Sequence, residues 1–156
     1  MPSDTPPSDD ATRAETTREL AMALGRINRA LARAYPGPLA TGALSALATV
    51  VREGPIRVGD LARREGLQPP NMSRIVAELE REGHLERHTD LDDRRSVYLV
   101  VTEIGQATYD DVWERRSRAL TEGVRAMDEP DQQTIRAMIA LLRQLGERIE
   151  RRHDNP

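Results

Sequence analysis

The chain has 156 residues, of which 38% are hydrophobic and 31% charged, and its net charge is −3 at pH 7. These values are typical of one globular domain large enough to bury a core, and a net negative charge does not by itself indicate a nucleic-acid partner. Cysteine is absent, which excludes disulfides, thiolate metal sites and thiol-based redox sensing.

Residues 1–11 are rich in proline, serine and aspartate, so we expect a disordered N-terminal tail. This tail has neither the basic nor the apolar segment of a signal peptide. No stretch of the chain approaches the roughly 18 apolar residues of a membrane span. We therefore expect no membrane association and a cytoplasmic location.

Residues 12–54 are expected to form N-terminal helices that support the fold and contribute to dimerisation. The first helix covers about 14–34, where Leu20, Leu24, Ile27 and Leu31 recur at helical spacing. A more apolar helix follows over about 39–52. Proline and glycine residues end both helices, at 36–38 and at 54–55.

Residues 55–101 show the order of a winged helix-turn-helix unit. A short helix is expected over 58–65 with Gly66 as its C-terminal cap, then a turn, then a helix over 69–82. Pro69 and Pro70 suit the first turn of that second helix, where a backbone N–H has no intrahelical partner. After Gly83 the pattern becomes strand-like at 84–87 and 96–101, which predicts a hairpin with a charged loop over 89–94.

Residues 102–150 are predicted to form C-terminal dimerisation helices, and residues 151–156 a fraying tail. Thr102 is the expected N-cap of a helix over 103–125. The last helix begins near 128–130 and carries an apolar stripe, formed by Ile135, Met138, Ile139, Leu142, Leu145 and Ile149. The predicted class is therefore mainly α with a small β-hairpin wing: a winged helix-turn-helix flanked by long dimerisation helices, all in one compact domain.

The helix over 69–82 has two distinct faces. Met72, Ile75, Val76 and Leu79 are expected to pack inward. The other face carries Asn71, Arg74, Glu78 and Arg81, with Ser73 at its edge. Asparagine can pair with adenine and arginine with guanine, each good pair giving about 1–3 kcal/mol of discrimination.

Ser73 and the backbone amides of the first turn suit phosphate. We therefore expect Pro69, Pro70, Asn71, Ser73 and Arg74 to lie at a DNA interface. An ordinary amphipathic helix with a solvated polar face is the alternative, and it would be favoured for this helix alone. The short helix before it and the hairpin after it favour the DNA interpretation.

The predicted hairpin loop carries a second candidate contact. Arg95 is expected to enter a minor groove, with Arg94 beside it and Asp93 placed to fix the Arg95 rotamer. A charged surface loop is the alternative interpretation, because three acidic residues in the loop oppose the approach of phosphate.

No catalytic or metal constellation can be assembled from the chain. His84, His88 and His153 lack metal-ligand spacing, and no nucleophile elbow, phosphate-binding glycine loop or HExxH helix is present. We therefore expect a non-enzyme that needs neither a metal nor a cofactor.

Taken together, these motifs resemble one known family. The stretch from Gly54 to Gly105 reads GPIRVGDLARREGLQPPNMSRIVAELEREGHLERHTDLDDRRSVYLVVTEIG, and it is similar to the winged helix-turn-helix core of the multiple-antibiotic-resistance regulator (MarR) family. The matching features are Gly54-Pro55, Leu61-Ala62, Ser73-Arg74 leading into Leu79-Glu80, Asp93-x-Arg95 and Thr102-x-x-Gly105. The resemblance extends over about 14–150.

The resemblance implies a homodimer with interlocking terminal helices that binds palindromic promoter sites on double-stranded DNA, usually as a repressor. It assigns Asn71, Ser73 and Arg74 to the major groove and Arg95, supported by Asp93, to the minor groove. Asp92 stands where many members have another arginine, which weakens the expected wing contact or shifts it to Arg94. A winged-helix protein–protein module without DNA binding is the alternative function, favoured by the acidic balance.

The resemblance also implies release of DNA by a small lipophilic or phenolic effector. Its cleft, between the dimer helices and the winged unit, would be lined by Leu24, Ile27, Leu47, Val51 and Trp113. These five residues suit a hydrophobic core equally well, and the core interpretation is the favoured one. Without cysteine, the peroxide-sensing branch of the family is excluded.

Overall fold

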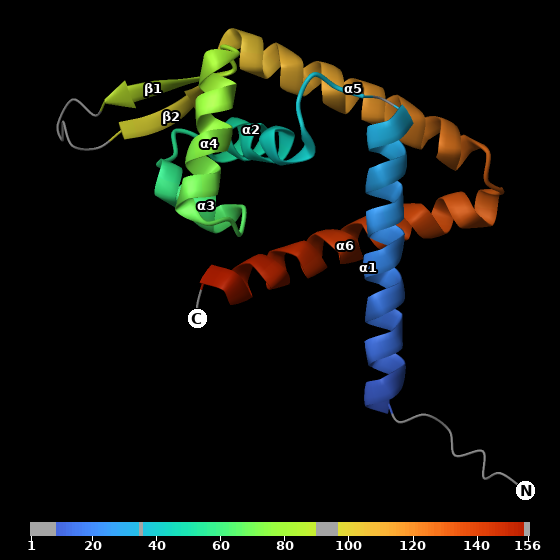
Figure 1. The fold of residues 1–156 in the computed structure, drawn as a ribbon. Coiled ribbons are helices and arrows are strands. Elements are labelled where there is room, and N and C mark those ends of the chain that lie inside the picture. The colour runs from blue at the N-terminus through green and yellow to red at the C-terminus, as the bar shows by residue number, and fades with distance from the viewer. Residues whose placement is uncertain (1–8, 35, 90–96, 155–156) are drawn as a thin grey trace, which may run out of the picture. The chain divides into compact units, whose positions relative to one another are not determined.

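A computed structural model describes residues 9–34, 36–89 and 97–154 of the chain. Within these ranges it contains six helices and two strands (Figure 1). They are α1 (Asp9–Ala34), α2 (Thr41–Glu53), α3 (Val58–Arg64), α4 (Pro69–Arg81), β1 (Leu85–Thr89), β2 (Val97–Val101), α5 (Glu103–Arg125) and α6 (Glu129–Asp154). The predicted mainly α class with one hairpin is confirmed. The chain forms two compact units that divide within α5, between residues 116 and 117.

Both terminal helices are longer than the sequence pattern predicts. The helix α1 begins at Asp9, so the disorder predicted for residues 9–11 is wrong. Asp9 and Asp10 lie in its first turn, where negative charge interacts favourably with the helix dipole. The helix α6 continues to Asp154, so the fraying predicted for 151–154 is also wrong. An i,i+4 ion pair between Arg151 and Glu147, 3.8 Å apart, supports this last turn.

Glycine-based caps shape the helix-turn-helix at two points. At the end of α3, Gly66 has a φ of 64°, and the Leu67 amide donates to the Ala62 carbonyl at 2.9 Å. At the end of α4, Gly83 has a φ of 76°, and the His84 amide donates to the Leu79 carbonyl at 2.8 Å. Both ends show the 6→1 hydrogen bond of a Schellman motif, in which a left-handed residue ends the helix. The predicted Gly66 cap is confirmed, and Gly83 ends α4 in the same way.

The hydrophobic core of the first unit is built from α2, α3, α4 and the hairpin. Its fully buried large side chains are Leu47, Leu61, Met72, Leu79, Leu99, Val50 and Val76. Three of the four residues predicted to face inward from α4 are among them, and the fourth, Ile75, is partly buried against the core. The apolar stripe of α4 therefore fixes which side of that helix faces outward.

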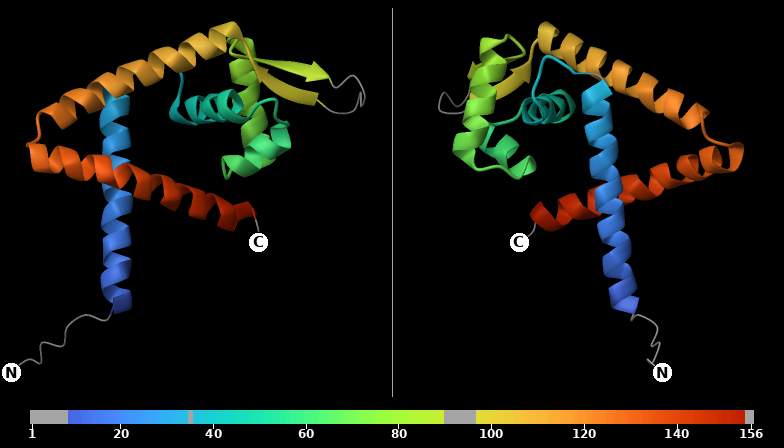
Figure 2. Two further views of the ribbon diagram at one scale, coloured as in Figure 1. Left: turned by 180° about the vertical axis from the view of Figure 1, so that it is seen from behind. Right: turned by 45° about the vertical axis from the view of Figure 1, so that its right-hand side comes forward.

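The strands β1 and β2 form an antiparallel pair, with a register that runs from Leu85 opposite Val101 to Thr89 opposite Val97. They extend away from α2, α3 and α4, as Figure 1 and the left view of Figure 2 show. Ile56, just before α3, adds a bridge to the other side of β2: its amide donates to the Leu99 carbonyl at 3.2 Å and its carbonyl accepts from the Leu99 amide at 2.8 Å. The sequence pattern did not predict this bridge, which ties the root of the hairpin to the chain entering α3.

The start of α5 is packed tightly against the end of α4. The Thr102 hydroxyl donates to the Gly83 carbonyl at 2.6 Å and accepts a hydrogen bond from the Gly105 amide at 3.0 Å. This confirms Thr102 as the N-cap of α5. A Cβ atom at Gly105 would lie only 2.1 Å from the His84 carbonyl oxygen, so the contact requires glycine.

Across the part of the chain that the structure describes, no helix has the length and apolar character needed to cross a membrane.

The tight contact between Gly105 at the start of α5 and the His84 carbonyl generates a stability prediction. Changing Gly105→Ala places a methyl group against backbone that cannot move aside, so we expect a loss of about 3 kcal/mol in the free energy of unfolding, near the upper end for overpacking. Chemical denaturation followed by circular dichroism measures it.

The matched control is Gly59→Ala in α3, where an added Cβ meets nothing within 4 Å. Because alanine is the better helix former, this variant should be neutral or more stable by up to about 1 kcal/mol. Equal stability of the Gly105→Ala variant and the unmodified protein would contradict the proposed tight contact.

Candidate nucleic-acid interface

The N-terminal half of α4 presents a polar surface to solvent. Pro69, Pro70, Asn71, Ser73 and Arg74 are all exposed. The opposite side of the same helix is held by core residues with no exposed surface. The residues that the sequence predicted for a major groove are therefore all exposed to solvent at the start of α4.

The first turn of α4 differs from the prediction in one respect. Pro69 and Pro70 occupy its first two positions and have no amide hydrogen. The next two amides, of Asn71 and Met72, both donate to the Gln68 carbonyl, at 3.0 and 3.2 Å. The expectation that backbone amides of this turn bind phosphate is therefore wrong, and a phosphate contact at this turn has to come from side chains such as Ser73.

Arg74 and Asn71 make no side-chain hydrogen bond or ion pair with the residues that the structure describes. Other arginines of this unit are engaged: Arg81 contacts Glu82 at 3.3 Å and Arg63 pairs with Asp60. A guanidinium without a protein partner keeps all five N–H donors for an external acceptor. Arg74 is thus the arginine of α4 best prepared to contact a base edge.

Two side-chain contacts fix the hairpin root relative to the helices. Arg87 of β1 pairs with Glu80 of α4, with 2.7 Å between Nε and Oε1. Arg57, before α3, donates to the Tyr98 hydroxyl of β2 at 3.2 Å, and its guanidinium carbon lies 5.2 Å from the centre of the Tyr98 ring. The Arg57–Tyr98 contact joins residues 41 positions apart, whereas Glu80 and Arg87 are seven positions apart, and no periodicity in the chain indicates either contact. The predicted minor-groove residues at 93–95 lie outside the described residues.

A cavity of about 180 Å³ lies in the first unit, between residues of α1, α2 and α5. Its polar lining includes Asn28, Ser45, Arg52 and Arg116, and its aromatic lining is Trp113. The arginines give this pocket a more polar character than the cleft predicted from sequence.

The five residues predicted for an effector cleft do not gather in one place. Trp113 lines this pocket. Leu47 is fully buried in the core, and Val51 packs against that core. Leu24 and Ile27 lie exposed on α1. Leu47 and Val51 are therefore core residues, as the alternative interpretation expected.

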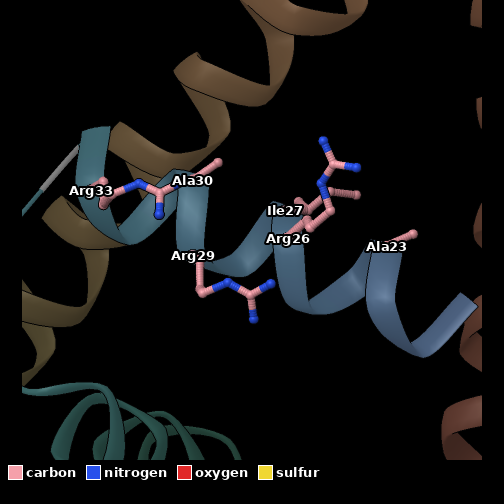
Figure 3. A pocket seen from close by; sticks show the side chains of 6 residues that line it. All are labelled: Ala23, Arg26, Ile27, Arg29, Ala30 and Arg33. Atoms are coloured by element: carbon pink, nitrogen blue, oxygen red, sulfur yellow. The ribbon is translucent and has the colours of Figure 1, made fainter. Parts of the chain in front are cut away.

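A larger hollow of about 570 Å³ runs along α1, and Ile27 is one of its lining residues. Figure 3 shows its lining side chains, in which the guanidinium groups of Arg26 and Arg29 extend to different sides of the helix. No three histidine, aspartate or glutamate side chains gather as a metal site within residues 9–34, 36–89 and 97–154.

Comparison with known proteins gives consistent findings. A sequence model of the MarR family matches residues 41–97. A transcriptional regulator of the helix-turn-helix type from Mycobacterium bovis is 30% identical over 130 residues, which cover 83% of this chain and 91% of the relative.

Two solved structures illustrate the shared fold. A MarR family protein from Bacillus stearothermophilus superposes with a TM-score of 0.74 at 23% identity, covering 92% of this chain and 99% of that one. An organohalide-sensing transcriptional regulator, solved in its 2,4-dichlorophenol-bound form, superposes with a TM-score of 0.61 at 20% identity, covering 92% of this chain and 88% of that one.

The ion pair at the hairpin root can be tested by a double-mutant cycle. Arg87→Gln and Glu80→Gln should each destabilise the fold slightly, with a coupling energy of about 0.5 kcal/mol, because both side chains are partly exposed. Urea denaturation of the two single variants and the double variant measures the coupling, which should decrease as salt is added. Strictly additive effects at low salt would show that the pair does not hold β1 to α4.

Proposed function

Because this chain belongs to the MarR family of transcriptional regulators, we propose that it is a homodimeric repressor that binds a palindromic site at a promoter. The observation that carries the proposal is the outer surface of α4, where Asn71 and Arg74 are exposed and make no side-chain hydrogen bond or ion pair with the described residues. These side chains stand on a helix whose opposite face is fully buried. Their orientation toward DNA is therefore set before binding.

The proposed contacts follow from groove chemistry. Asn71 pairs with adenine, Arg74 forms a bidentate contact with guanine O6 and N7, and Ser73 binds phosphate. Pro69 and Pro70 support the approach of the helix end, because neither has a backbone N–H group to desolvate. Since the net charge is −3, binding depends on where these few groups lie and not on an overall positive charge.

The wing supplies the second contact of the proposal. Arg95, supported by Asp93 and assisted by Arg94, enters the minor groove beside the site read by α4. The support for this part lies at the hairpin root, where the Arg87–Glu80 pair and the Arg57–Tyr98 contact restrict how β1 and β2 can move relative to the helices.

Dimerisation is supported by exposed apolar side chains on the terminal helices. Met22 on α1 is 62% exposed, and Leu141 on α6 is 64% exposed. Large exposed apolar side chains that lie close together are usual at interfaces between subunits. The predicted stripe on α6 adds four more of them: Met138, Ile139, Leu145 and Ile149. Two copies of α4 in a dimer would read half-sites about one helical turn apart, which is roughly 34–36 Å.

We also propose that a small lipophilic or phenolic molecule regulates DNA binding. The organohalide-sensing regulator crystallised with 2,4-dichlorophenol supports this idea. In this chain the cavity beside Trp113 is a candidate location. A repressor of this kind would act in the cytoplasm, where promoter DNA is found.

Changing Arg74→Ala should lower sequence discrimination more than overall DNA affinity. Loss of a bidentate arginine–guanine pair is expected to weaken specific binding by about 1–3 kcal/mol while non-specific binding changes little. Gel-shift titrations against the DNA upstream of the chain's own coding region, and against an unrelated duplex of equal length, measure both affinities.

Arg81→Ala is the matched control, because Arg81 is exposed at the far end of the same helix and already contacts Glu82. It should leave the ratio of specific to non-specific affinity unchanged. Equal losses on both duplexes for Arg74→Ala would show that Arg74 contacts only phosphate. Absence of any DNA binding by the unmodified protein would favour a protein–protein module instead.

The dimer is tested by the mass of the protein in solution. Light scattering after size exclusion should give twice the 17.5 kDa of one chain. Leu145→Glu should raise the dimer dissociation constant roughly a hundredfold or more, because an unpaired carboxylate is costly to bury at an interface. Gln144→Glu, which alters the exposed neighbouring position, should leave the mass unchanged. A 17.5 kDa species for the unmodified protein would contradict the proposal.

A further inference from the structure

The helix α1 carries a charged stripe along one side, which we call the α1 seam. Its members recur at alternating spacings of four and three residues, which keeps them on one face of a helix. They are Glu15, Glu19, Met22, Arg26, Arg29 and Arg33. All six side chains are exposed, and none of the five charged ones makes a hydrogen bond or an ion pair with the described residues. The seam is therefore a surface that the chain itself leaves uncovered.

The α1 seam is separate from the apolar stripe of the same helix. Each member of that stripe comes five residues after a member of the seam. The stripe consists of Leu20, Leu24, Ile27 and Leu31. Five residues correspond to about 140° around a helix with 3.6 residues per turn. The two stripes thus lie on different sides of α1, and a partner that covers the apolar stripe leaves the seam to another partner.

The charges of the α1 seam change sign along the helix. Its two acidic members come first, Met22 follows with 62% of its surface exposed, and the three arginines come last. Within one chain this order is unfavourable, because neighbours four residues apart such as Glu15 and Glu19 carry like charges. The helix dipole favours acids in the first turn and bases in the last turn, but its effect falls off beyond those turns. It therefore does not account for Glu19 or Arg26, which lie in the middle of α1.

The same order becomes favourable when two copies of α1 lie antiparallel. The spacing of four, three, four, three and four residues reads the same from both ends, so two antiparallel seams match along their whole length. Glu15 then faces the partner's Arg33, and Glu19 faces the partner's Arg29. Because such a contact has twofold symmetry, each of these ion pairs occurs twice. Met22 lies opposite the partner's Arg26, whose aliphatic stem can cover it while the guanidinium stays in water.

The arginine half of the α1 seam has room for side chains of a partner. A hollow of about 570 Å³ lies along it, and Arg26, Arg29 and Arg33 all line this hollow. The guanidinium groups of Arg26 and Arg29 diverge there (Figure 3). No acidic residue occurs in the sequence between Glu19 and Glu53, so no carboxylate close in sequence neutralises these arginines. The acidic half of the seam would repel the phosphates of a nucleic acid, which favours a protein partner with both signs of charge.

We propose that the α1 seam is a contact between two copies of this chain from different dimers, with their α1 helices antiparallel. This inference rests on the dimer of the proposed function and goes beyond it, because it adds a second contact that joins one dimer to another. Exposed ion pairs each stabilise little and weaken as salt is added. The association of dimers is therefore weak and depends on ionic strength.

Sedimentation equilibrium over a range of protein concentrations tests this association. At about 50 mM NaCl the mass should rise from that of a dimer toward that of four chains or more, and at about 500 mM NaCl it should stay at that of a dimer. Arg29→Glu places like charges opposite each other and should raise the dissociation constant between dimers at least about tenfold. Arg13→Glu is the matched control. Arg13 is exposed on α1 outside the seam and pairs with Asp10 at 3.3 Å, so the same change in charge there should have no such effect.

An exchange of charges separates a direct contact from a general disturbance of α1. Glu19→Arg alone should weaken the association as Arg29→Glu does. A chain with both substitutions should associate like the unmodified protein, because opposite charges again face each other. A mixture of the two single variants should also associate, because the arginine introduced in one faces the glutamate introduced in the other. Mixing would not reverse a loss of helix stability.

The outcomes distinguish this inference from the proposed function. A dimer mass at every concentration in low salt, or a charge exchange that fails to restore association, would overturn the inference and leave the proposed dimer standing. If Arg29→Glu lowers DNA affinity and Glu19→Arg raises it while the mass stays constant, the seam binds nucleic acid and the inference is wrong. A single-chain mass at both salt concentrations would overturn the proposed dimer, and this inference with it.

Discussion

The burial of one face of α4 is the constraint on which the rest of the structure depends. Met72, Val76 and Leu79 have no exposed surface, and they pack with α2, α3 and the hairpin in a single core. Rotation of α4 about its axis would bring these side chains into water and polar ones into the core, at a cost of roughly 1.5–3 kcal/mol for each large apolar side chain exposed. The outer face with Asn71 and Arg74 is therefore determined by the inner face.

The surroundings of α4 restrict its two ends in different ways. At its C-terminal end, the Gly83 turn, the Thr102 cap and the close approach of Gly105 to the His84 carbonyl join α4, β1 and the start of α5 within a few residues. The C-terminal end of α4 therefore has little room to move, because tightly packed backbone atoms cannot shift without a large cost in free energy. At its N-terminal end, the preceding turn is held both by the backbone hydrogen bond from Leu67 to Ala62 and by side-chain contacts between α2 and α3. The Thr49–Glu65 hydrogen bond and the Arg64–Glu53 ion pair, 3.1 Å long, are both found there.

The helix α2 contributes residues both to the hydrophobic core and to the cavity beside Trp113. Its core side includes Leu47, which is fully buried against α3, α4 and the hairpin, while Ser45 and Arg52 line the cavity on its other side. The polar residues of α2 therefore lie both at the cavity and at the end of α3.

Local features of the sequence determined the elements and most of the candidate interface. Helical spacing, two glycine caps, the Pro69-Pro70 start and the Thr102 cap each depend on neighbours within a few residues, so the fold class and the outer face of α4 could be predicted from them. The wing residues at 93–95 were named from the same kind of pattern and stay a prediction.

Only the tertiary structure decided the contacts between distant segments. These include the Ile56 bridge to Leu99, the Arg57–Tyr98 contact and the hydrogen bond from Thr49 to Glu65. The tertiary structure also separated Leu47 and Val51, which belong to the core, from Trp113, which lines a cavity. A periodic pattern states that a side chain is apolar and on which face it lies, but not which surface meets that face. Which residues contact one another across elements is determined when the helices pack, and no local sequence pattern indicates these contacts.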